Sequence, residues 1–427
     1  MSNRQALSRR GQFFLLALFP IYFIIAGLFL QPLDEILPGL LALIREPDFL
    51  ITDYLVVGGT GAAFLNAGVL ALLSVALLYS LGLDLDGHAV TSVCLMFGFS
   101  LFGKNLVNIW AVLAGVWLYS QYHRTPFSRY VYIGLYGTSL SPIITQMMQI
   151  GHLPVPVRLL LAIGSGVVIG FVLPPLATHA HYAHKGYSLY NVGFAAGIIA
   201  TVAVSLLRSF DIDIESRLIW HTGSNGLFFA LLALLFAGMS LGALWWGGAR
   251  SVLSAYQALL RTPGLGGTDY LREQGGAATL FNMGVNGLLA CALVVLVGAD
   301  LNGPTIGSIF TIVGFSATGK HLRNILPVML GVFVASLTKN WDINQPAPIL
   351  AFLLSTTLAP IAGEFGWLAG IVAGFLHSSV ALNVGIVYGG MNLYNNGFAG
   401  GLIAMFLVPV IQSIRSRKAR AKEEVSL

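Results

Sequence analysis

Two lysines stand within apolar sequence in two copies of one motif. The first copy reads GFSLFGKNLVN at 98–108 and the second reads GFSATGKHLRN at 314–324, so Lys104 and Lys320 are equivalent. A lysine in an apolar membrane segment is costly, and such residues usually serve a function. Its positive charge would attract an anionic or carbonyl-rich solute. In the structural alternative, the ammonium pairs with backbone carbonyls at a helix end or reaches the membrane interface.

Polar and small residues accompany both lysines, and a second repeated block adds more. This block reads SLYNVGFAAGIIA at 188–200 and NLYNNGFAGGLIA at 392–404, and nine of thirteen positions match. Asparagine amides and helix N-termini would supply donors that bind an anion. The alternative roles are close helix packing by the small residues and capping by the asparagines. The predicted substrate-binding residues are Ser100, Gly103, Lys104, Asn105, Asn108, Ser316, Gly319, Lys320, His321, Asn324, Asn191, Asn395 and Asn396.

Three further features carry weaker signals. Tyr190 and Tyr394 precede the asparagines of the second block and fit either a binding role or the membrane interface, where tyrosine is enriched. Asn66 and Asn282 fall early in equivalent apolar helices, and we expect them to form interhelical hydrogen bonds. Glu364 is a carboxylate in an apolar segment of the second half and a candidate for proton coupling, but it lies near an expected helix end.

An internal duplication places these motifs at corresponding points of two halves. Residues 59–120 align with residues 275–336 at a constant offset of 216 without a gap, and 26 of the 62 positions are identical. Chance does not produce such a match. The chain therefore divides into a first transmembrane repeat at 1–225, a second at 226–414 with its first helix at 226–248 and a cytoplasmic linker at 249–274, and a basic cytoplasmic tail at 415–427.

The composition excludes a soluble globular protein. Of 427 residues, 56% are hydrophobic and 9% are charged, whereas soluble domains have about 25% charged residues. Several apolar segments reach the ~20 residues of a spanning helix, and they lack the alternating hydrophobicity of a transmembrane barrel. The predicted fold class is therefore all-α, a polytopic helical membrane protein. Basic residues near both ends fit the positive-inside rule better than nucleic-acid binding, so we expect no nucleic-acid partner.

The distribution of charge predicts that the two halves have opposite orientations. Basic residues at both ends place both termini in the cytoplasm. The segment 226–248 is preceded by acidic residues and followed by basic ones, so we expect it to run from outside to inside, opposite to the first helix. This is an inverted-topology repeat, the plan of many secondary transporters. The acidic residues are Asp211, Asp213 and Glu215, and the basic ones are Arg250, Arg261 and Arg272.

The lysine motifs lie in segments of unusual length. As one helix, residues 88–121 would be ~51 Å long, which exceeds a hydrocarbon core of ~30 Å, yet the segment is too short for two full spans. Two short steep helices or a re-entrant hairpin remain, and we prefer the hairpin. Irregular backbone at membrane depth must be buried in protein or line a watery cavity. We therefore expect about ten spanning helices plus two re-entrant hairpins with the lysines at their tips, and fourteen spanning helices are the alternative.

The LYNNGFAGG block and the twin GFS-x-x-GK segments resemble an uncharacterised bacterial family of integral-membrane proteins, known only as a domain of unknown function. The resemblance covers nearly the whole chain and implies no assigned activity. In plan, the sequence also resembles secondary transporters with paired re-entrant hairpins in inverted halves, among them dicarboxylate and citrate carriers. No motif of those carriers transfers residue by residue, so that likeness is one of architecture.

We predict a secondary transporter that moves a small polar, anionic solute across the bacterial cytoplasmic (inner) membrane. Alternating access would occur at a midplane site between the two hairpin tips. The first alternative is a passive anion or small-solute channel. The second is a membrane-embedded metalloenzyme, because imidazoles suit zinc or iron and the segment ATHAHYAHKG contains His179, His181 and His184. These histidines have no counterparts in the second half, so we expect no enzyme activity, no metal site and no cofactor.

The expected partners are membrane lipid and a small-molecule substrate, and a homodimer is compatible with the sequence. The coupling ion is open between sodium and a proton. Carboxylates are scarce in the apolar segments, which disfavours a buried proton relay, whereas carbonyls and Asn or Ser oxygens suffice to hold sodium.

Overall fold

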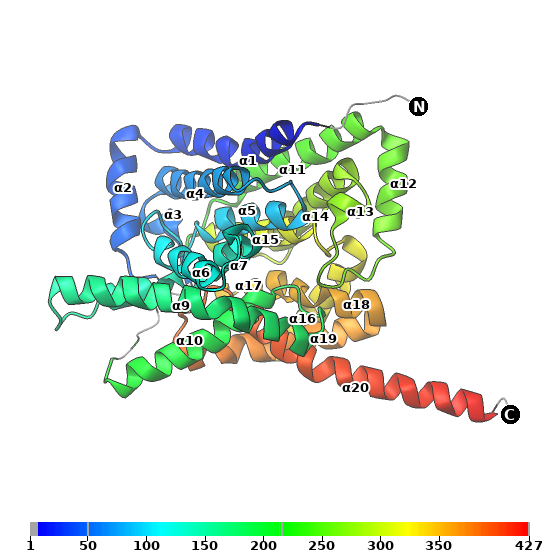
Figure 1. The fold of residues 1–427 in the computed structure, drawn as a ribbon. Helices are drawn as coiled ribbons and strands as arrows, with labels where there is room; N and C mark the ends of the chain where they lie inside the picture. Colours follow the sequence, from blue (N-terminus) through cyan, green and yellow to red (C-terminus); the bar gives the residue numbers. More distant parts are fainter. Residues whose placement is uncertain (1–6, 49–50, 213, 215–216, 426–427) are drawn as a thin grey trace.

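A computed structural model describes residues 7–48, 51–212, 214 and 217–425, with side chains as far as Arg417. The fold is all-α (Figure 1), apart from a pair of two-residue parallel strands, β1 (Ile51–Thr52) and β2 (Leu218–Ile219). Within the described residues, nine helices are long and apolar enough to cross a membrane. The prediction of a polytopic helical membrane protein is therefore confirmed at this level. Asp213 and Glu215, which contributed to the predicted orientation, lie outside the described residues.

The described part of each half contains the same succession of helices. The first half comprises α1 (Arg9–Leu30), α2 (Leu33–Arg45), α3 (Tyr54–Val57), α4 (Thr60–Ser80), α5 (Gly87–Phe99), α6 (Trp110–Tyr122), α7 (Val131–Gly137), α8 (Ser141–Met148), α9 (Val155–His184) and α10 (Asn191–Ser209). The second half comprises α11 (Asn225–Gly247), α12 (Ala249–Leu259), α13 (Tyr270–Glu273), α14 (Gly276–Leu296), α15 (Gly303–Phe315), α16 (Leu322–Ser336), α17 (Pro346–Leu354), α18 (Ala359–Phe365), α19 (Trp367–Val384) and α20 (Asn395–Val425).

Local signals at equivalent positions explain why the halves form the same elements. Asp53 caps α3 by accepting the Leu55 N–H at 3.0 Å, and Asp269 caps α13 by accepting the Leu271 N–H at 3.0 Å. Such carboxylates satisfy backbone donors that a helix start leaves unpaired. The residue before α4 and the residue before α14 are both glycines with φ near +85°, a conformation that other residues adopt only with strain.

The short helices α5 and α15 lie side by side in the centre of the molecule and run antiparallel. Thr91 Oγ1 donates to the Gly314 carbonyl at 2.9 Å near one end of the pair, and the backbones of Gly98 and Gly307 touch near the other. The start of each helix lies against the turn that follows the other. Each helix has 13 residues and is therefore about 20 Å long, shorter than a hydrocarbon core of about 30 Å.

Other helices surround this central pair and cross where glycines allow close approach. α6 packs on α9 through Gly115, and α16 packs on α19 through the equivalent Gly331. A Cβ at Gly115 would lie 2.2 Å from the Val167 carbonyl oxygen, and one at Gly331 would lie 2.0 Å from that of Ile371. Small residues at such crossings are typical of helix packing in membranes.

Two apolar segments, one in each half, are interrupted. The segment at 130–148 is divided into α7, a 3₁₀ turn at Thr138–Leu140 and α8, and its equivalent is divided into α17, a 3₁₀ turn at Ser355–Leu358 and α18. Pro142 and Pro360 lie in the first turns of α8 and α18. A proline lacks the N–H that would continue the preceding helix, so the break falls just before it.

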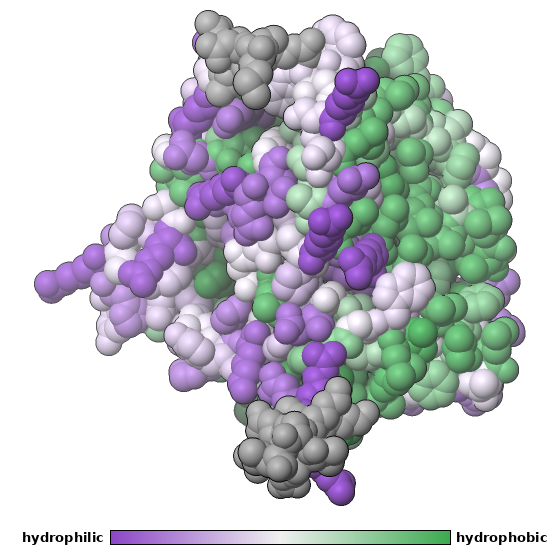
Figure 2. Space-filling view, turned by 90° about the vertical axis from the view of Figure 1, so that its right-hand side faces the viewer, coloured by the Kyte–Doolittle hydropathy of each residue, from purple (hydrophilic) through white to green (hydrophobic). Residues whose placement is uncertain are grey.

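The equivalent helices α2 and α12 stand at opposite ends of the molecule, roughly perpendicular to long helices such as α1 and α11 (Figure 1). α1 begins and α20 ends at the end where α12 is found. α12 falls within the predicted cytoplasmic linker, which is therefore partly helical. Figure 2 views this end and shows hydrophilic residues over much of it, with a hydrophobic flank on the right of the view.

Candidate functional site

Each lysine lies in an irregular turn between two short helices. Gly103 and Gly319 precede the lysines with φ values of +133° and +144°, which favour glycine. Asn66 from α4 donates to the Ser100 and Lys104 carbonyls at 2.7 and 2.9 Å, and Asn282 from α14 makes the equivalent bonds, both at 2.8 Å. The predicted hydrogen bonds of these asparagines therefore join a long helix to each lysine turn.

Both lysine side chains are fully buried. The Lys104 ammonium lies 3.3 Å from Tyr394 Oη, 3.5 Å from the Leu135 carbonyl oxygen and 3.7 Å from Met96 Sδ. The Lys320 ammonium donates to Tyr190 Oη at 2.5 Å and to Thr356 Oγ1 at 2.8 Å. Neither lysine has a carboxylate partner among the residues that the structure describes.

The tyrosines are exchanged between the halves. Tyr394 of the second half contacts Lys104 of the first, and Tyr190 of the first half contacts Lys320 of the second. Each ammonium also lies over the ring of that tyrosine, 5.2 Å from the Tyr394 centroid and 4.4 Å from the Tyr190 centroid. Such cation–π contacts favour a positive charge. The two lysines and two tyrosines therefore form one site to which both halves contribute.

The interrupted helices position the tyrosines. The Leu189 N–H donates to the Thr357 carbonyl at 2.9 Å, and the Leu393 N–H donates to the equivalent Ser139 carbonyl at 3.1 Å. Directly after the tyrosines, α10 and α20 begin, and their first turns touch at Gly193. The N-termini of both helices are thus directed at the site, where their dipoles add positive potential.

Two cavities approach the tyrosines from different sides. The first, of about 640 Å³, is lined by both Tyr190 and Tyr394 and by the cationic Arg129. The second, of about 650 Å³, reaches Leu393 but neither tyrosine. Asn396 lines both cavities. Equivalent parts of the two halves line the two cavities, because Ala177 and Asn191 of the first correspond to Ala381 and Asn395 of the second.

The predicted site residues fall into two groups. Asn191 and Asn396 line the first cavity, and Asn395 and Asn396 line the second. The others build the lysine turns behind the tyrosines, and none of them lines the three cavities resolved among the described residues. Members of the turn group are Ser100, Gly103, Lys104, Asn105, Asn108, Ser316, Gly319, Lys320, His321 and Asn324.

Hydrogen bonds explain why the turn residues are polar. Ser100 Oγ donates to the Met96 carbonyl at 2.6 Å, and Ser316 Oγ donates to that of Ile312 at 2.8 Å. The asparagines act in the same way, since Asn108 and Asn324 each donate to the carbonyl of the glycine in their turn. Asn105 accepts the Asn108 N–H at 3.0 Å. His321 Nε2 bonds the Thr262 carbonyl at 3.0 Å.

Asp48 is a buried residue that the sequence did not single out. Its Oδ1 accepts the Tyr54 hydroxyl at 2.5 Å, and its Oδ2 accepts Asn108 Nδ2 and Thr145 Oγ1, both at 2.9 Å. It lies between α2 and β1, outside the candidate spans. Burial raises the pKa of the Asp48 carboxyl to about 7, although the three hydrogen bonds oppose the shift. In the sequence, Asp48 is marked only by its place between Pro47 and an apolar run.

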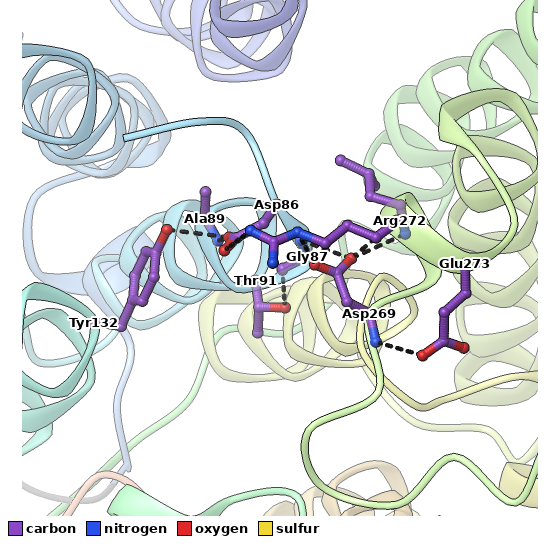
Figure 3. Close-up of polar contacts among 9 residues, drawn as sticks. Asp86, Gly87, Ala89, Thr91, Tyr132, Asp269, Arg272 and Glu273 are labelled. Atoms are coloured by element: carbon purple, nitrogen blue, oxygen red, sulfur yellow. Dashed lines mark hydrogen bonds and ion pairs between the residues drawn. The ribbon is translucent and has the colours of Figure 1, made fainter. Parts of the chain in front are cut away.

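Charged residues join the halves at the end where α12 lies (Figure 3). Asp86 caps α5, and its carboxylate also accepts the Tyr132 hydroxyl at 3.0 Å. Arg272 reaches from α13 to Asp86 at 3.5 Å and to Asp269 at 3.3 Å. Asp269 in turn accepts the Gly87 N–H at 3.2 Å. The beginning of α5 is therefore tied both to α7, which contains Tyr132, and to the second half.

The three histidines of the segment ATHAHYAHKG do not form a cluster of metal ligands. His184 bonds Asn191 Oδ1 through Nε2 at 2.9 Å, and the rings of His181 and His184 are 5.8 Å apart. Across the described part of the chain, no three His, Cys, Asp or Glu side chains are grouped so that they could hold a metal ion.

Comparison with known proteins gives one family. The sequence profile described as protein of unknown function (DUF1576) matches residues 33–209 and 249–413. The two matched segments begin at the first residues of the equivalent helices α2 and α12. No curated protein and no solved structure matches the chain.

Proposed function

The chain belongs to the DUF1576 family, and from this premise we propose that it is a secondary transporter for a small anionic solute in the bacterial cytoplasmic membrane. The observation that carries the proposal is the pair of fully buried lysines without carboxylate partners among the described residues. Burying an unpaired ammonium is costly. An anion that enters between the tyrosines would offset this cost, so the site favours an anion over a cation or a neutral solute.

The placement of equivalent elements supports an inverted-topology repeat. α5 and α15 are equivalent, and they run antiparallel in the centre. The equivalent helices α2 and α12 lie at opposite ends of the molecule (Figure 1). With both termini in the cytoplasm, the α12 end is the cytoplasmic one and the α2 end is external.

Short helices and returning loops support two re-entrant hairpins. The segment that leaves the α12 end at Asp86 comes back to it at Tyr132, whose hydroxyl bonds the Asp86 carboxylate. The segment that carries Lys320 also returns to the end from which it starts. Asn344, which follows this segment, lies near Gly298, which precedes it. α5, α6, α15 and α16 have 13 to 15 residues, fewer than the ~20 of a full span. This arrangement favours about ten spans with two hairpins over fourteen spans.

The two cavities support alternating access. The cavity lined by Arg129 opens toward the loops that the proposed topology assigns to the cytoplasm, and it reaches both tyrosines. The second cavity includes Arg217 near β2 and ends before the tyrosines. We therefore assign this conformation as open to the cytoplasm and closed to the outside. Because equivalent residues line the two cavities, an exchange of conformation between the halves would open the second cavity to the outside and close the first to the cytoplasm.

The experiment is uptake of radiolabelled citrate, succinate or phosphate into liposomes that contain the purified protein. We expect at least one of these anions to accumulate above its external concentration when an ion gradient is applied, and we expect Lys104→Met to abolish this uptake. Lys339→Met is the matched control, because Lys339 is a partly buried lysine that bonds the Phe375 carbonyl away from the site. Uptake that only equilibrates would assign a channel instead. Full uptake by Lys104→Met would refute the role of the lysine site.

A further inference from the structure

We propose that Asp48 binds the proton that couples this transport to a proton gradient. The inference rests on the proposed transport function and names its coupling ion. Asp48 is a buried carboxylate that contacts no cation within the described residues. It is also hydrogen-bonded to the turn that carries Lys104, so a change in its protonation would be felt at the anion site.

The contacts around Asp48 suit a proton better than sodium. Its three side-chain partners are the Tyr54 hydroxyl, the Asn108 amide and the Thr145 hydroxyl, and all three donate to it. A sodium site requires oxygen lone pairs directed at the ion, whereas here donor hydrogens occupy the carboxylate oxygens. Such donors stabilise the ionised form, and burial stabilises the neutral form. The two effects oppose each other, which leaves both forms accessible near neutral pH.

One amide links Asp48 to the lysine turn. Asn108 Nδ2 donates both to Asp48 Oδ2 at 2.9 Å and to the Gly103 carbonyl at 3.0 Å. Ser141 Oγ of α8 donates to the same carbonyl at 2.9 Å, and Thr145 lies one turn further along α8. Asp48 therefore contacts both the lysine turn and the interrupted helix that packs beside it.

In the described part of the second half, no carboxylate takes the place of Asp48. The position equivalent to Asp48 is Gly264, which lies against the backbone of Gly319 in the second lysine turn, where a Cβ on Gly264 would be 2.0 Å from the Gly319 carbonyl oxygen. The second turn is held there by direct backbone contact. Within the residues that the structure describes, a carboxylate bonded to a lysine turn is therefore found only in the first half.

The charged and titratable groups around Asp48 are few. Tyr54 is its hydrogen-bond partner, and the Glu46 carboxylate at the end of α2 is the only other charge acting on it from the described residues. Glu46 itself lies 3.8 Å from Arg217. Arg45, the neighbour of Glu46, is exposed, so water reaches the chain three residues before Asp48. The proposed topology places this α2 end of the molecule outside.

The coupling step moves one proton and breaks no covalent bond of the chain. A hydronium ion from the external water transfers a proton to a carboxylate oxygen of Asp48 and leaves water behind. The neutral carboxyl is a weaker acceptor, so the amide of Asn108 and the hydroxyl of Thr145 lose much of their hold on it. The lysine turn and α8 are then free to separate. Release of the proton to the cytoplasmic side restores the bonds.

Infrared difference spectroscopy tests proton binding without a substrate. The purified protein is titrated across the neutral range while the carbonyl stretch of protonated carboxyl groups is recorded. We expect a component that titrates near neutral pH, is absent in Asp48→Asn and moves to higher pH in Tyr54→Phe, because loss of a donor disfavours the ionised form. Unchanged titrations in both variants would refute the proposal. Displacement of the component by sodium chloride, but not by choline chloride, would assign the site to sodium.

Asp53 is the control for this titration. It is also buried, and burial raises the pKa of its carboxyl to about 7. Its acceptors are occupied by the backbone N–H groups of Leu55 and His221, and its equivalent, Asp269, has the same capping role in the second half. We expect Asp53→Asn to leave the Asp48 component in place, which separates the two carboxyls.

Liposome uptake separates failure of the proton site from failure of transport. If citrate, succinate or phosphate is taken up, acidifying the outside is expected to accelerate uptake by the wild type and to have no effect on Asp48→Asn. Wild-type uptake that is indifferent to the pH gradient would refute proton coupling but keep the transporter. If none of the three anions is taken up, the proposed function fails, and the infrared titration still decides whether Asp48 binds a proton.

Discussion

The two lysine sites have the same construction, yet the two ammonium groups are held to different degrees. Lys320 has a hydroxyl partner at 2.5 Å and another at 2.8 Å. Lys104 has no partner closer than 3.3 Å. Thr138, the equivalent of Thr356, bonds Met96 Sδ at 3.5 Å instead of the lysine. Lys104 thus keeps unused donor capacity for a ligand, whereas Lys320 is engaged by one hydroxyl from each half.

The same asymmetry appears behind the lysines. Asp48 bonds the first turn through Asn108, whereas Gly264 presses directly on the second turn. A duplicated fold has therefore kept its helix contacts in both halves and diverged in the polar groups around each lysine. In the proposed mechanism, the first half carries the responsive side of the site and the second half carries the fixed side.

The largest expected effect is the same in both halves, because it concerns packing. We predict that Gly115→Val and Gly331→Val each lower the free energy of unfolding by about 3 kcal/mol or more, since the new side chain would overlap a carbonyl of the facing helix. Thermal unfolding in detergent measures the loss. Gly164→Val is the control, because a Cβ there meets nothing within 4 Å. Unequal losses in the two halves would break the equivalence of the crossings.

The next effect belongs to the first half alone. Burial raises the pKa of Asp48 from 3.8 to about 7, so between these values the folded chain holds a proton that the unfolded chain releases. Stability from this group is then full at acidic pH and declines as pH rises through that window. This group lowers the free energy of unfolding by roughly 2 to 4 kcal/mol across that pH window, and we predict that the decline is absent in Asp48→Asn. Unfolding measured against pH checks this, and an unchanged slope in the variant would contradict it.

Replacing the lysines should separate binding from stability. Lys104→Met is predicted to weaken binding of the most stabilising anion among citrate, succinate and phosphate by about tenfold to a hundredfold, with little change in melting temperature. Lys320→Met leaves the hydroxyls of Tyr190 and Thr356 without their partner and is predicted to cost about 1 to 3 kcal/mol of stability. Thermal-shift titrations give both quantities. Identical behaviour of the two variants would remove the distinction drawn between the sites.

The smallest effect concerns the ion pairs of Figure 3. The Arg272 side chain is 69% exposed, and the equivalent position in the first half is Val56, so the second lysine segment manages without this charge. We predict that Arg272→Gln costs less than about 1 kcal/mol. The melting temperature at low and high salt checks this. A loss much larger than this, abolished by salt, would show that the pair holds the halves together.

The sequence carried enough information for the fold class and for the internal equivalences. Lys104 and Lys320 could be paired because the duplication left their motifs in register, and the family match confirms the expected family. The all-α membrane fold followed from long apolar segments. The interruption at Thr138–Leu140 was signalled only by Pro142, since a 3₁₀ turn of three residues is too short to change the apolar character of the whole segment.

Other parts of the site depend on contacts between distant segments and were not readable from the chain. The exchange of Tyr190 and Tyr394 requires the relative placement of the halves, which no local pattern encodes. Asp48 resembled an ordinary loop carboxylate, because its burial comes from Asn108 and Thr145 far along the sequence. Comparison of the two halves did not reveal Asp48 either, because it finds residues that both halves share, and the equivalent of Asp48 is Gly264.

The most direct test is the structure of the protein determined with the most stabilising of citrate, succinate and phosphate bound. The proposed function predicts density for the anion between Tyr190 and Tyr394, with the Lys104 ammonium within hydrogen-bond distance of it and the bonds of Lys320 to Tyr190 and Thr356 retained. Anion density away from both tyrosines, with the Lys104 ammonium still facing Tyr394 and the Leu135 carbonyl, would contradict it.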